Sequence, residues 1–431
     1  MNFLNRYRKI PRSILLMIAA AFFVHLINAS FILILNIYLR KQGYADENIA
    51  QFNSFRFLGI LFLAFPLGIF IKGKALKPFF LAASLLVPLF SLFLVLSIQG
   101  GDETRITLGF ILWGVSFMIL NVCGLPYIMR SAPEAVVSEA ISLNFSVWSL
   151  ATIVSGSLIN ILSNLKEIVI GGVTIPLDEF HIMLVIISIS SLSFILVLFI
   201  KEAKPRSRSS SFFQNLSALR SDYDWTLIAR VLVPNMIIAT GAGLTIPFVN
   251  LFFNSVFKVD SDTFSLIGAG TALIVFLSTL FIPIIRRKFG FRVAILIPQS
   301  LAVFFLVVLA TTQIAQAYSW AFYVAIAAFM IRQPLMNMAG PMTSELGMKY
   351  VGARNQELIS AMSSSIWSAS WFISAKIFQI LREMDIEYYQ IFLITAAMYA
   401  VGVGFYHLLI NDFLRREPEE NQGPVLPDIQ I

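Results

Sequence analysis

Long apolar runs, separated by short polar segments, make up most of this sequence. Twelve of the runs have about 20 to 30 residues, which is enough for an α-helix, rising ~1.5 Å per residue, to cross a bilayer. The helices are expected at residues 13–40, 46–71, 76–98, 106–130, 136–163, 180–201, 225–256, 262–286, 291–314, 318–348, 354–381 and 388–413. The pattern predicts an all-α polytopic membrane protein surrounded by the lipid bilayer.

One polar segment, between the sixth and seventh runs, divides the chain into two parts. It reads KEAKPRSRSSSFFQNLSALRSDYDW and is rich in basic residues and serine, which is typical of a linker. The predicted units are an N-terminal six-helix half (1–201), a cytoplasmic basic linker (202–224), a C-terminal six-helix half (225–414) and a cytoplasmic tail (415–431).

The two halves also repeat each other in sequence, at an offset of 214 residues. NIYLRKQGYAD, which begins at Asn36, aligns with NLFFNSVFKVD, which begins at Asn250. IKGK, which begins at Ile71, aligns with IRRK, which begins at Ile285. Each half therefore forms one six-helix unit, and we expect the pair to be related by an axis along the membrane normal.

Composition and charge agree with a membrane protein. Only 13% of the residues are charged, whereas soluble domains have about 25%. If the N-terminus lies inside, the inner segments hold 21 Lys and Arg residues and the outer segments hold 6, so the positive-inside rule places both termini in the cytoplasm. The same rule accounts for the net charge of +7, and we expect no nucleic-acid partner.

Few residues are suited to metal, redox or covalent chemistry. Cys123 is the only cysteine, the three histidines are far apart, and no nucleophile–base pair or phosphate loop is visible. The sequence therefore predicts that the protein has no cofactor and is not an enzyme. The first apolar run follows MNFLNRYRKIPRS and has no small-residue cleavage site, so it is predicted to be a retained helix and not a signal peptide.

The twelve spans, the 6+6 repeat, the basic linker and the cytoplasmic termini together resemble the major facilitator superfamily (MFS) of secondary transporters. RRKFGFR (286–292) is similar to the family's cytoplasmic loop motif, Asp-Arg-x-Gly-Arg-Arg after a Gly, but Arg287 stands where the Asp would be. The copy in the first half, GIFIKGKALK, also lacks the acid. The resemblance implies a gating role for these loop residues: Lys72, Lys74, Arg286, Arg287, Gly290 and Arg292.

The resemblance also bears on mechanism. MFS transporters work by alternating access around a central cavity lined by spans 1, 4, 7 and 10, and we expect the same here, in a monomer of the cell inner membrane. The Gly-Pro-x-x-Gly-Gly motif of the family's drug exporters belongs in the fifth span. That span reads SVWSLATIVSGSLINIL and lacks the motif, which counts against a proton-driven drug exporter.

Four basic residues lie inside spans: Arg56, Arg230, Arg332 and Lys376. An ionised side chain near the bilayer centre costs roughly 2.5–3.5 kcal/mol on insertion scales, so it needs a partner or a water-filled cavity. Arg332 follows Trp320 by 12 residues, which places it about 18 Å from the outer end of its helix, near the midplane. Snorkelling to the interface is the expected explanation for Arg230 and Lys376.

The deep polar residues define a predicted substrate site. Acidic residues are missing from the deep parts of the spans, so the site would be positive and would favour an anion. His25 is the one deep group that titrates near neutral pH, so it is the candidate for proton coupling, with a structural role as the alternative. The predicted substrate-binding residues are Arg332, Gln333, Asn337, His25, Asn28, Arg56, Asn121 and Asn235.

Two repeated tryptophans have a simpler explanation in the sequence. Trp148 in SVWS and Trp367 in SIWS occupy equivalent places in the two halves. We interpret them as residues that pack the repeat.

The sequence therefore predicts a secondary transporter that moves a small organic anion by alternating access, with Arg332 as the clamp for a carboxylate or phosphate. The alternative is an exporter of amphipathic drugs, which would use the aromatic residues and not the arginines. A transporter-derived sensor or scaffold is a third possibility, and it would need a larger partner-binding extension than the short tail provides.

Overall fold

The computed structural model describes residues 3–44, 46–170, 173–202, 223–259 and 261–416. Most of the predicted linker (202–224) and of the tail (415–431) lies outside these residues. The N-terminal half contains α1 (Phe3–Tyr7), α2 (Arg12–Ser30), the π-helical turn η1 (Phe31–Leu35), α3 (Asn36–Lys41), α4 (Asp46–Ile71), α5 (Lys77–Gly100), α6 (Glu103–Ser131), the 3₁₀ turn η2 (Glu134–Val136), α7 (Val137–Leu165), β1 (Glu167–Ile170), β2 (Val173–Pro176), α8 (Glu179–Ser190) and α9 (Leu192–Leu198).

The C-terminal half has the same order of long helices. It contains α12 (Trp225–Thr245), the 3₁₀ turn η3 (Ile246–Phe248), α13 (Val249–Phe257), α14 (Ser261–Thr311), α15 (Ser319–Val351), α16 (Gln356–Glu383) and α17 (Tyr388–Arg416). The hairpin of β1 and β2, which the sequence did not predict, joins the fifth and sixth spans and is antiparallel.

The long helix α14 covers two predicted spans, 262–286 and 291–314. It bends at Gly290, whose φ of 76° and ψ of −178° are not helical. Glycine adopts positive φ without the steric cost that a Cβ brings, so the chain can reverse here without a separate loop. The predicted boundary therefore lies within this bend.

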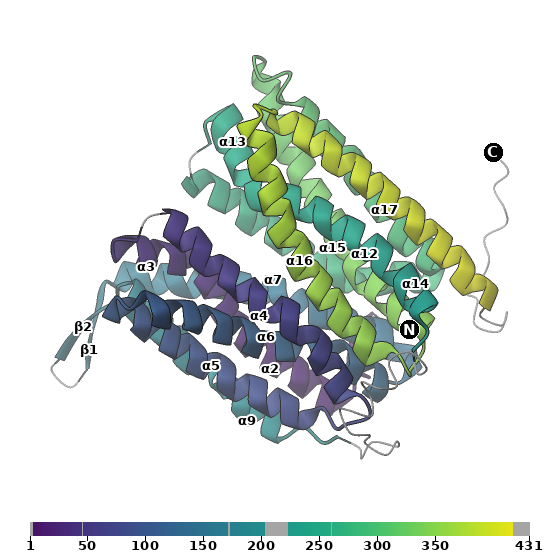
Figure 1. The fold of residues 1–431 in the computed structure, drawn as a ribbon, viewed down its shortest axis with the longest axis horizontal. Helices are drawn as coiled ribbons and strands as arrows, with labels where there is room; N and C mark the ends of the chain where they lie inside the picture. Colours follow the sequence, from purple (N-terminus) through teal and green to yellow (C-terminus); the bar gives the residue numbers. More distant parts are fainter. Residues whose placement is uncertain (1–2, 45, 171–172, 203–222, 260, 417–431) are drawn as a thin grey trace.

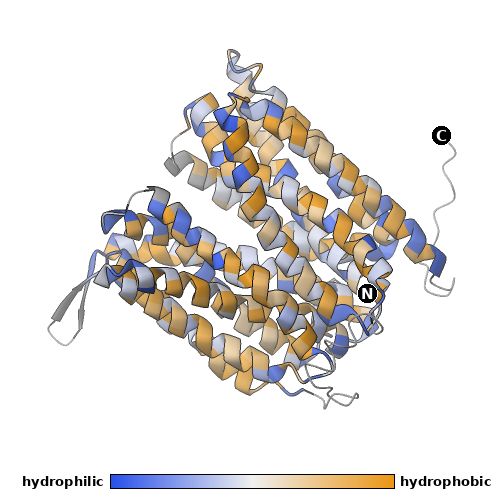
Figure 2. Ribbon diagram, in the orientation of Figure 1, coloured by the Kyte–Doolittle hydropathy of each residue, from blue (hydrophilic) through white to orange (hydrophobic). Residues whose placement is uncertain are grey.

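Among the described residues, nine helices or helix pairs are long and apolar enough to cross a membrane. One of the nine contains the eighth and ninth predicted spans together. Figure 2 shows mostly hydrophobic residues along the outer helices and hydrophilic residues at the helix ends. The chain is a multi-pass membrane protein.

The helices form two bundles, one from each half of the sequence (Figure 1). The bundles converge at the end that carries the N-terminus and separate toward the end that carries α3 and α13. Between the halves, α4 packs against α16 and α7 packs against α14.

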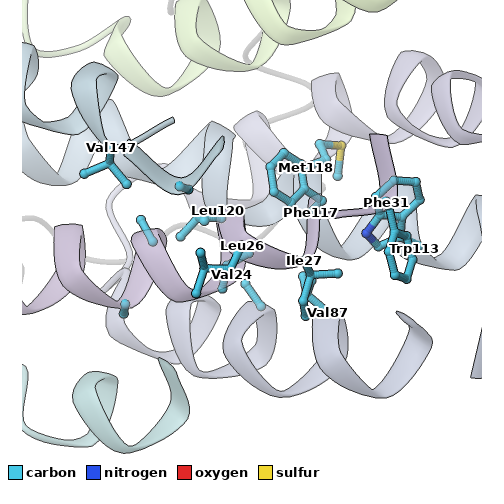
Figure 3. Packing of buried hydrophobic residues seen from close by; sticks show 14 of the residues in the cluster. Val24, Leu26, Ile27, Phe31, Val87, Trp113, Phe117, Met118, Leu120 and Val147 are labelled. Carbon is cyan, nitrogen blue, oxygen red and sulfur yellow. The ribbon is translucent and has the colours of Figure 1, made fainter. Parts of the chain in front are cut away.

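Each half has its own hydrophobic core. In the N-terminal half, Figure 3 shows Ile27 of α2 close to Val87 of α5, and Phe31 of η1 close to Trp113 of α6. Glycines allow close packing at particular helix crossings. A Cβ on Gly114 of α6 would lie 2.3 Å from the backbone oxygen of Arg56, so α4 can approach α6 only because this residue has no side chain.

Candidate functional site: the central cavity

A cavity of about 540 Å³ lies between the two halves. Four helices of each half line it: α2, α4, α6 and α7 from the first, and α12, α15, α16 and α17 from the second. This volume is within the range of about 300–1,000 Å³ that is usual for small-molecule sites.

Arg56 of α4 is the only Lys, Arg, Asp or Glu among the described residues that line the cavity. Its guanidinium donates a hydrogen bond to Oδ1 of Asn28. The same group lies over the ring of Trp113, 4.1 Å from the centroid, which is a favourable cation–π distance. Asn28 is fully buried and lies behind Arg56, so it positions the guanidinium and does not itself line the cavity.

His25 of α2 lines the cavity between two aromatic rings. It makes edge-to-face contacts with Phe117 and Trp148, each with a centroid separation of 5.3 Å. Its Nδ1 is buried and has no hydrogen-bond partner among the described residues. The imidazole is therefore held by ring packing, and its Nδ1 makes no hydrogen bond with the described residues.

Asn121 of α6 and Asn235 of α12 also line the cavity. Oδ1 of Asn235 accepts a hydrogen bond of 3.0 Å from Nε1 of Trp367. The structure therefore brings His25, Arg56, Asn121 and Asn235 together around one space, as the sequence predicted for substrate-binding residues.

Other lining residues were not predicted from the sequence to bind a substrate. Trp148 and Trp367, interpreted there as packing residues, are each 38% exposed and line the cavity from opposite halves. One face of α16 adds a row of hydroxyl groups spaced three, one and four residues apart, from Ser360, Ser363, Ser364 and Ser368. This helical spacing was a readable signal for a polar face.

Arg332 lies elsewhere in this structure. It is 2% exposed and donates hydrogen bonds to Oε1 of Gln333 (2.7 Å) and to the hydroxyl of Tyr399 on α17 (3.1 Å). Asn337 donates to the backbone oxygen of Gln333 at 2.8 Å. Arg332, Gln333 and Asn337 are not among the residues that line the cavity.

The other two basic residues in the spans are solvent- or lipid-facing at the helix ends. Arg230 makes an ion pair of 2.6 Å with Asp412, and its side chain is 48% exposed. Lys376 donates to Oε1 of Gln379 at 3.2 Å and is exposed. Both positions agree with snorkelling side chains.

Ion pairs between the halves lie beneath the cavity, at the end where the bundles converge. Arg130 of α6 pairs with Glu357 of α16, and Arg287 of α14 pairs with Glu139 of α7. Lys349 adds a longer contact of 3.5 Å to Glu134. These contacts hold the two halves together at this end.

Glu139 and Glu357 are a symmetric pair that the sequence analysis missed. They begin the equivalent segments EAIS (139–142) and ELIS (357–360), each in the first turn of its helix. A carboxylate in the first turn is stabilised by the helix dipole. Each half thus supplies an acid for a basic residue of the other.

The six loop residues expected to act in gating lie at this same end. Arg286 pairs with Glu345 at 3.2 Å, and Arg292 donates to Oδ1 of Asn411 at 2.6 Å. Nζ of Lys72 lies 4.1 Å from the ring centroid of Tyr223, and the backbone oxygen of Lys74 accepts from Arg130 at 2.9 Å.

Comparison with known proteins finds similar structures but no similar sequence. No protein-family model matches the chain, and no curated protein matches it. Among solved structures, a bacterial homologue of the iron transporter ferroportin in the outward-facing state aligns with a TM-score of 0.76 and 10% identity, covering 93% of this chain and 100% of that chain.

Two sugar transporters are similar in structure as well. The E. coli fucose:proton symporter FucP aligns with a TM-score of 0.67 and 14% identity, over 91% of this chain and 97% of that chain. The proton:xylose symporter XylE aligns with a TM-score of 0.69 and 13% identity, over 92% and 95%. The predicted fold is therefore confirmed: the chain has the MFS fold.

Proposed function

We propose that this protein is a secondary transporter that carries a small organic anion through the central cavity by alternating access. The observation that supports it most directly is Arg56. It is the one permanently charged residue among the described cavity-lining residues, and no carboxylate of that lining neutralises it. A guanidinium in a site of low dielectric attracts carboxylate or phosphate groups and binds them with directed hydrogen bonds.

The contacts between the halves support the alternating-access part of the proposal. With the termini in the cytoplasm, the paired ends carrying Arg130–Glu357 and Arg287–Glu139 form the cytoplasmic gate. The cavity is then closed toward the cytoplasm, which is the outward-facing arrangement. Transport would require these ion pairs to separate as the halves rock.

Arg56 replaces Arg332 as the substrate clamp in this proposal, because Arg332 is packed against Tyr399 and does not line the cavity. Asn121 and Asn235 would supply hydrogen bonds to the substrate. His25 is proposed as the group that carries a proton, since its imidazole lines the cavity and its Nδ1 has no partner among the described residues.

The substrates named for the similar structures fit this cavity less well. Among the described residues, no group of three His, Cys, Asp or Glu side chains could hold a metal ion. A sugar would leave the charge of Arg56 without a partner of opposite sign, and this is costly away from water.

The experiment compares ligands of matched shape and different charge. Binding of lactate and benzoate to the purified protein is measured by calorimetry, beside lactamide, benzamide, benzylamine and the sugars fucose and xylose. We expect the carboxylates to bind and Arg56→Gln to weaken them roughly 10- to 150-fold, since a hydrogen bond to a charged group contributes about 1.5–3 kcal/mol. Arg56→Lys should restore only part of the affinity, because a point charge does not reproduce the guanidinium fork.

Arg230→Gln is the matched control, because Arg230 is an in-span arginine that lies outside the central cavity. It should leave the affinities unchanged. Binding of fucose, xylose or benzylamine in the absence of carboxylate binding would contradict the proposal.

A second candidate is an exporter of amphipathic drugs, which the many aromatic residues of the cavity lining favour. The same panel separates the two functions. A drug exporter of this type would bind the benzylamine cation at least as well as benzoate and would not depend on Arg56.

A further inference from the structure

The cavity lining is rich in aromatic rings and, among the described residues, holds one permanent charge. Seven aromatic residues and one histidine contribute to it: His25, Phe57, Phe117, Phe145, Trp148, Trp367, Trp371 and Tyr406. A ligand that used only Arg56 and the polar groups would leave most of these rings in contact with water.

Trp148 and Trp367 differ from tryptophans that only pack the protein interior. Trp113, which packs under Arg56, is 1% exposed, whereas Trp148 and Trp367 are each 38% exposed. Because both of them line the cavity, each has surface that a ligand there can contact. They also occupy equivalent positions in the repeat, so one indole comes from each half.

The two indoles are held by their surroundings in different ways. Nε1 of Trp367 donates to Asn235 at 3.0 Å, so the polar edge of this ring is already satisfied. The ring planes of Trp148 and His25 meet at 85° with a centroid separation of 5.3 Å. Both rings are therefore fixed by neighbouring side chains before any ligand binds, which lowers the entropy that binding must overcome.

From these observations we infer that the site selects flat aromatic anions, which place a carboxylate on Arg56 and stack an aromatic ring on Trp148 and Trp367. The inference rests on the proposed function for the anionic part and adds the aromatic part. Aromatic pairs prefer offset-stacked or edge-to-face geometry and stabilise binding beyond the burial of area. Since the tryptophans come from the two halves, such a ligand would contact both moving parts of the transporter.

The test compares benzoate with cyclohexanecarboxylate, two acids with the same charge and similar size, of which only benzoate has a π-face. Calorimetry on the purified full-length protein should show benzoate binding about 2- to 10-fold more tightly for each stacked ring. Trp148→Leu and Trp367→Leu should reduce this ratio toward one, because leucine offers no π-face to the ligand. Trp148→Phe and Trp367→Phe keep a ring and should retain a preference for benzoate.

Trp320→Leu is the control, since Trp320 is 53% exposed at the start of α15 and lies outside the cavity lining. It should leave the ratio unchanged. Equal binding of the two acids by the wild-type protein would overturn the aromatic inference and leave the proposed function intact. Binding of benzylamine or benzamide with no binding of either acid would overturn both.

Discussion

Arg56 and Arg332 both lie deep within apolar helices, and their partners give them different roles. Arg56 is held by Asn28 and Trp113 so that its guanidinium meets the cavity. Arg332 bonds Gln333 and Tyr399, and these partners keep it between α15 and α17. The first is placed to meet a ligand, and the second is placed to join two helices of one half.

We predict that Arg332→Lys destabilises the fold and does not weaken anion binding. A single ammonium does not reproduce the two separate guanidinium nitrogens that bond Gln333 and Tyr399. A buried polar group that loses its partner costs about 1–3 kcal/mol. The melting temperature in detergent should fall, while the affinity for benzoate should stay within about twofold of the wild type.

Tyr399→Phe gives an independent measure of the same contact, because it removes the hydroxyl that Arg332 bonds. It should lower the melting temperature in the same direction. If Arg332→Lys instead folded normally and lost benzoate binding, Arg332 would belong to the substrate site in another conformation.

The depth of a residue in the membrane can be predicted from such a sequence, but the direction in which its side chain points cannot. The spacing of Arg332 from the ends of its helix shows that it lies far from both interfaces. Whether it faces the cavity or a neighbouring helix depends on the rotation of α15, which is set by packing against distant parts of the chain. The grouping of four other residues could be predicted, because the repeat and the family resemblance indicate that several of their helices surround one cavity. These residues are His25, Arg56, Asn121 and Asn235.

At the scale of the helix, small residues decide how closely the elements approach. α4 and α6 cross where Gly114 faces the backbone of Arg56, and a Cβ there would also lie 3.0 Å from Cγ of Arg56. The close approach of α4 to α6 therefore determines where the charged side chain of Arg56 lies in the cavity wall. Such a contact is hidden in a single sequence, since a glycine in an apolar run has several possible causes.

Gly114→Ala should accordingly weaken both stability and anion binding. The added methyl group overpacks the crossing, which typically costs about 1–3 kcal/mol, and it pushes Arg56 away from Asn28 and Trp113. Thermal melting and calorimetry with benzoate measure the two effects. Gly404→Ala on α17 is the control, because its Cβ would meet no atom within 4 Å and the residue lies outside the cavity lining; a loss of binding as large in this variant would argue against the packing explanation.

At the scale of the whole molecule, two glutamates at equivalent positions of the repeat form the ion pairs of the proposed gate. Glu139 and Glu357 begin equivalent helices, and each pairs with an arginine of the opposite half. The pairs cross between the bundles, so they stabilise the closed form of the end that carries them, which is the proposed cytoplasmic gate. They add nothing to the stability of an isolated half.

We predict that the double change Glu139→Gln and Glu357→Gln shifts the protein toward the inward-facing state. In a Cys123→Ala background, a cysteine at Ser364 in the cavity reports access from outside through its reaction with an impermeant maleimide. The labelling rate in intact cells should fall, since removing one partner of a buried pair costs several kcal/mol and about 1.4 kcal/mol changes a two-state population ratio tenfold.

Glu134→Gln is the control for this experiment. Glu134 also faces the opposite half, but its side chain is 74% exposed and its contact with Lys349 is 3.5 Å long. Exposed pairs contribute little, so the labelling rate should not change. A decrease in this control as large as in the double variant would refute the assignment of the gate to the buried glutamates.

The orientation of the whole chain is a separate prediction. Reporter fusions at residue 210 and after Ile431 should both read out as cytoplasmic, because the basic residues lie on that side by 21 to 6. A periplasmic signal at either position would reverse the assignment of the gate, since the ion-paired end would then face outward.

The polar character of α15 and α16 has a consequence for how the protein is made. α15 carries a buried arginine and two prolines, and α16 has a row of serines on its cavity face. The translocon releases a nascent helix into lipid according to its apolarity, and an arginine at the helix centre works strongly against that step. We therefore expect α15 and α16 to enter the membrane by packing against earlier helices, such as α12 and α14, beside the translocon. The polar features that line the cavity between the finished bundles therefore make α15 and α16 depend on other helices for their entry into the membrane.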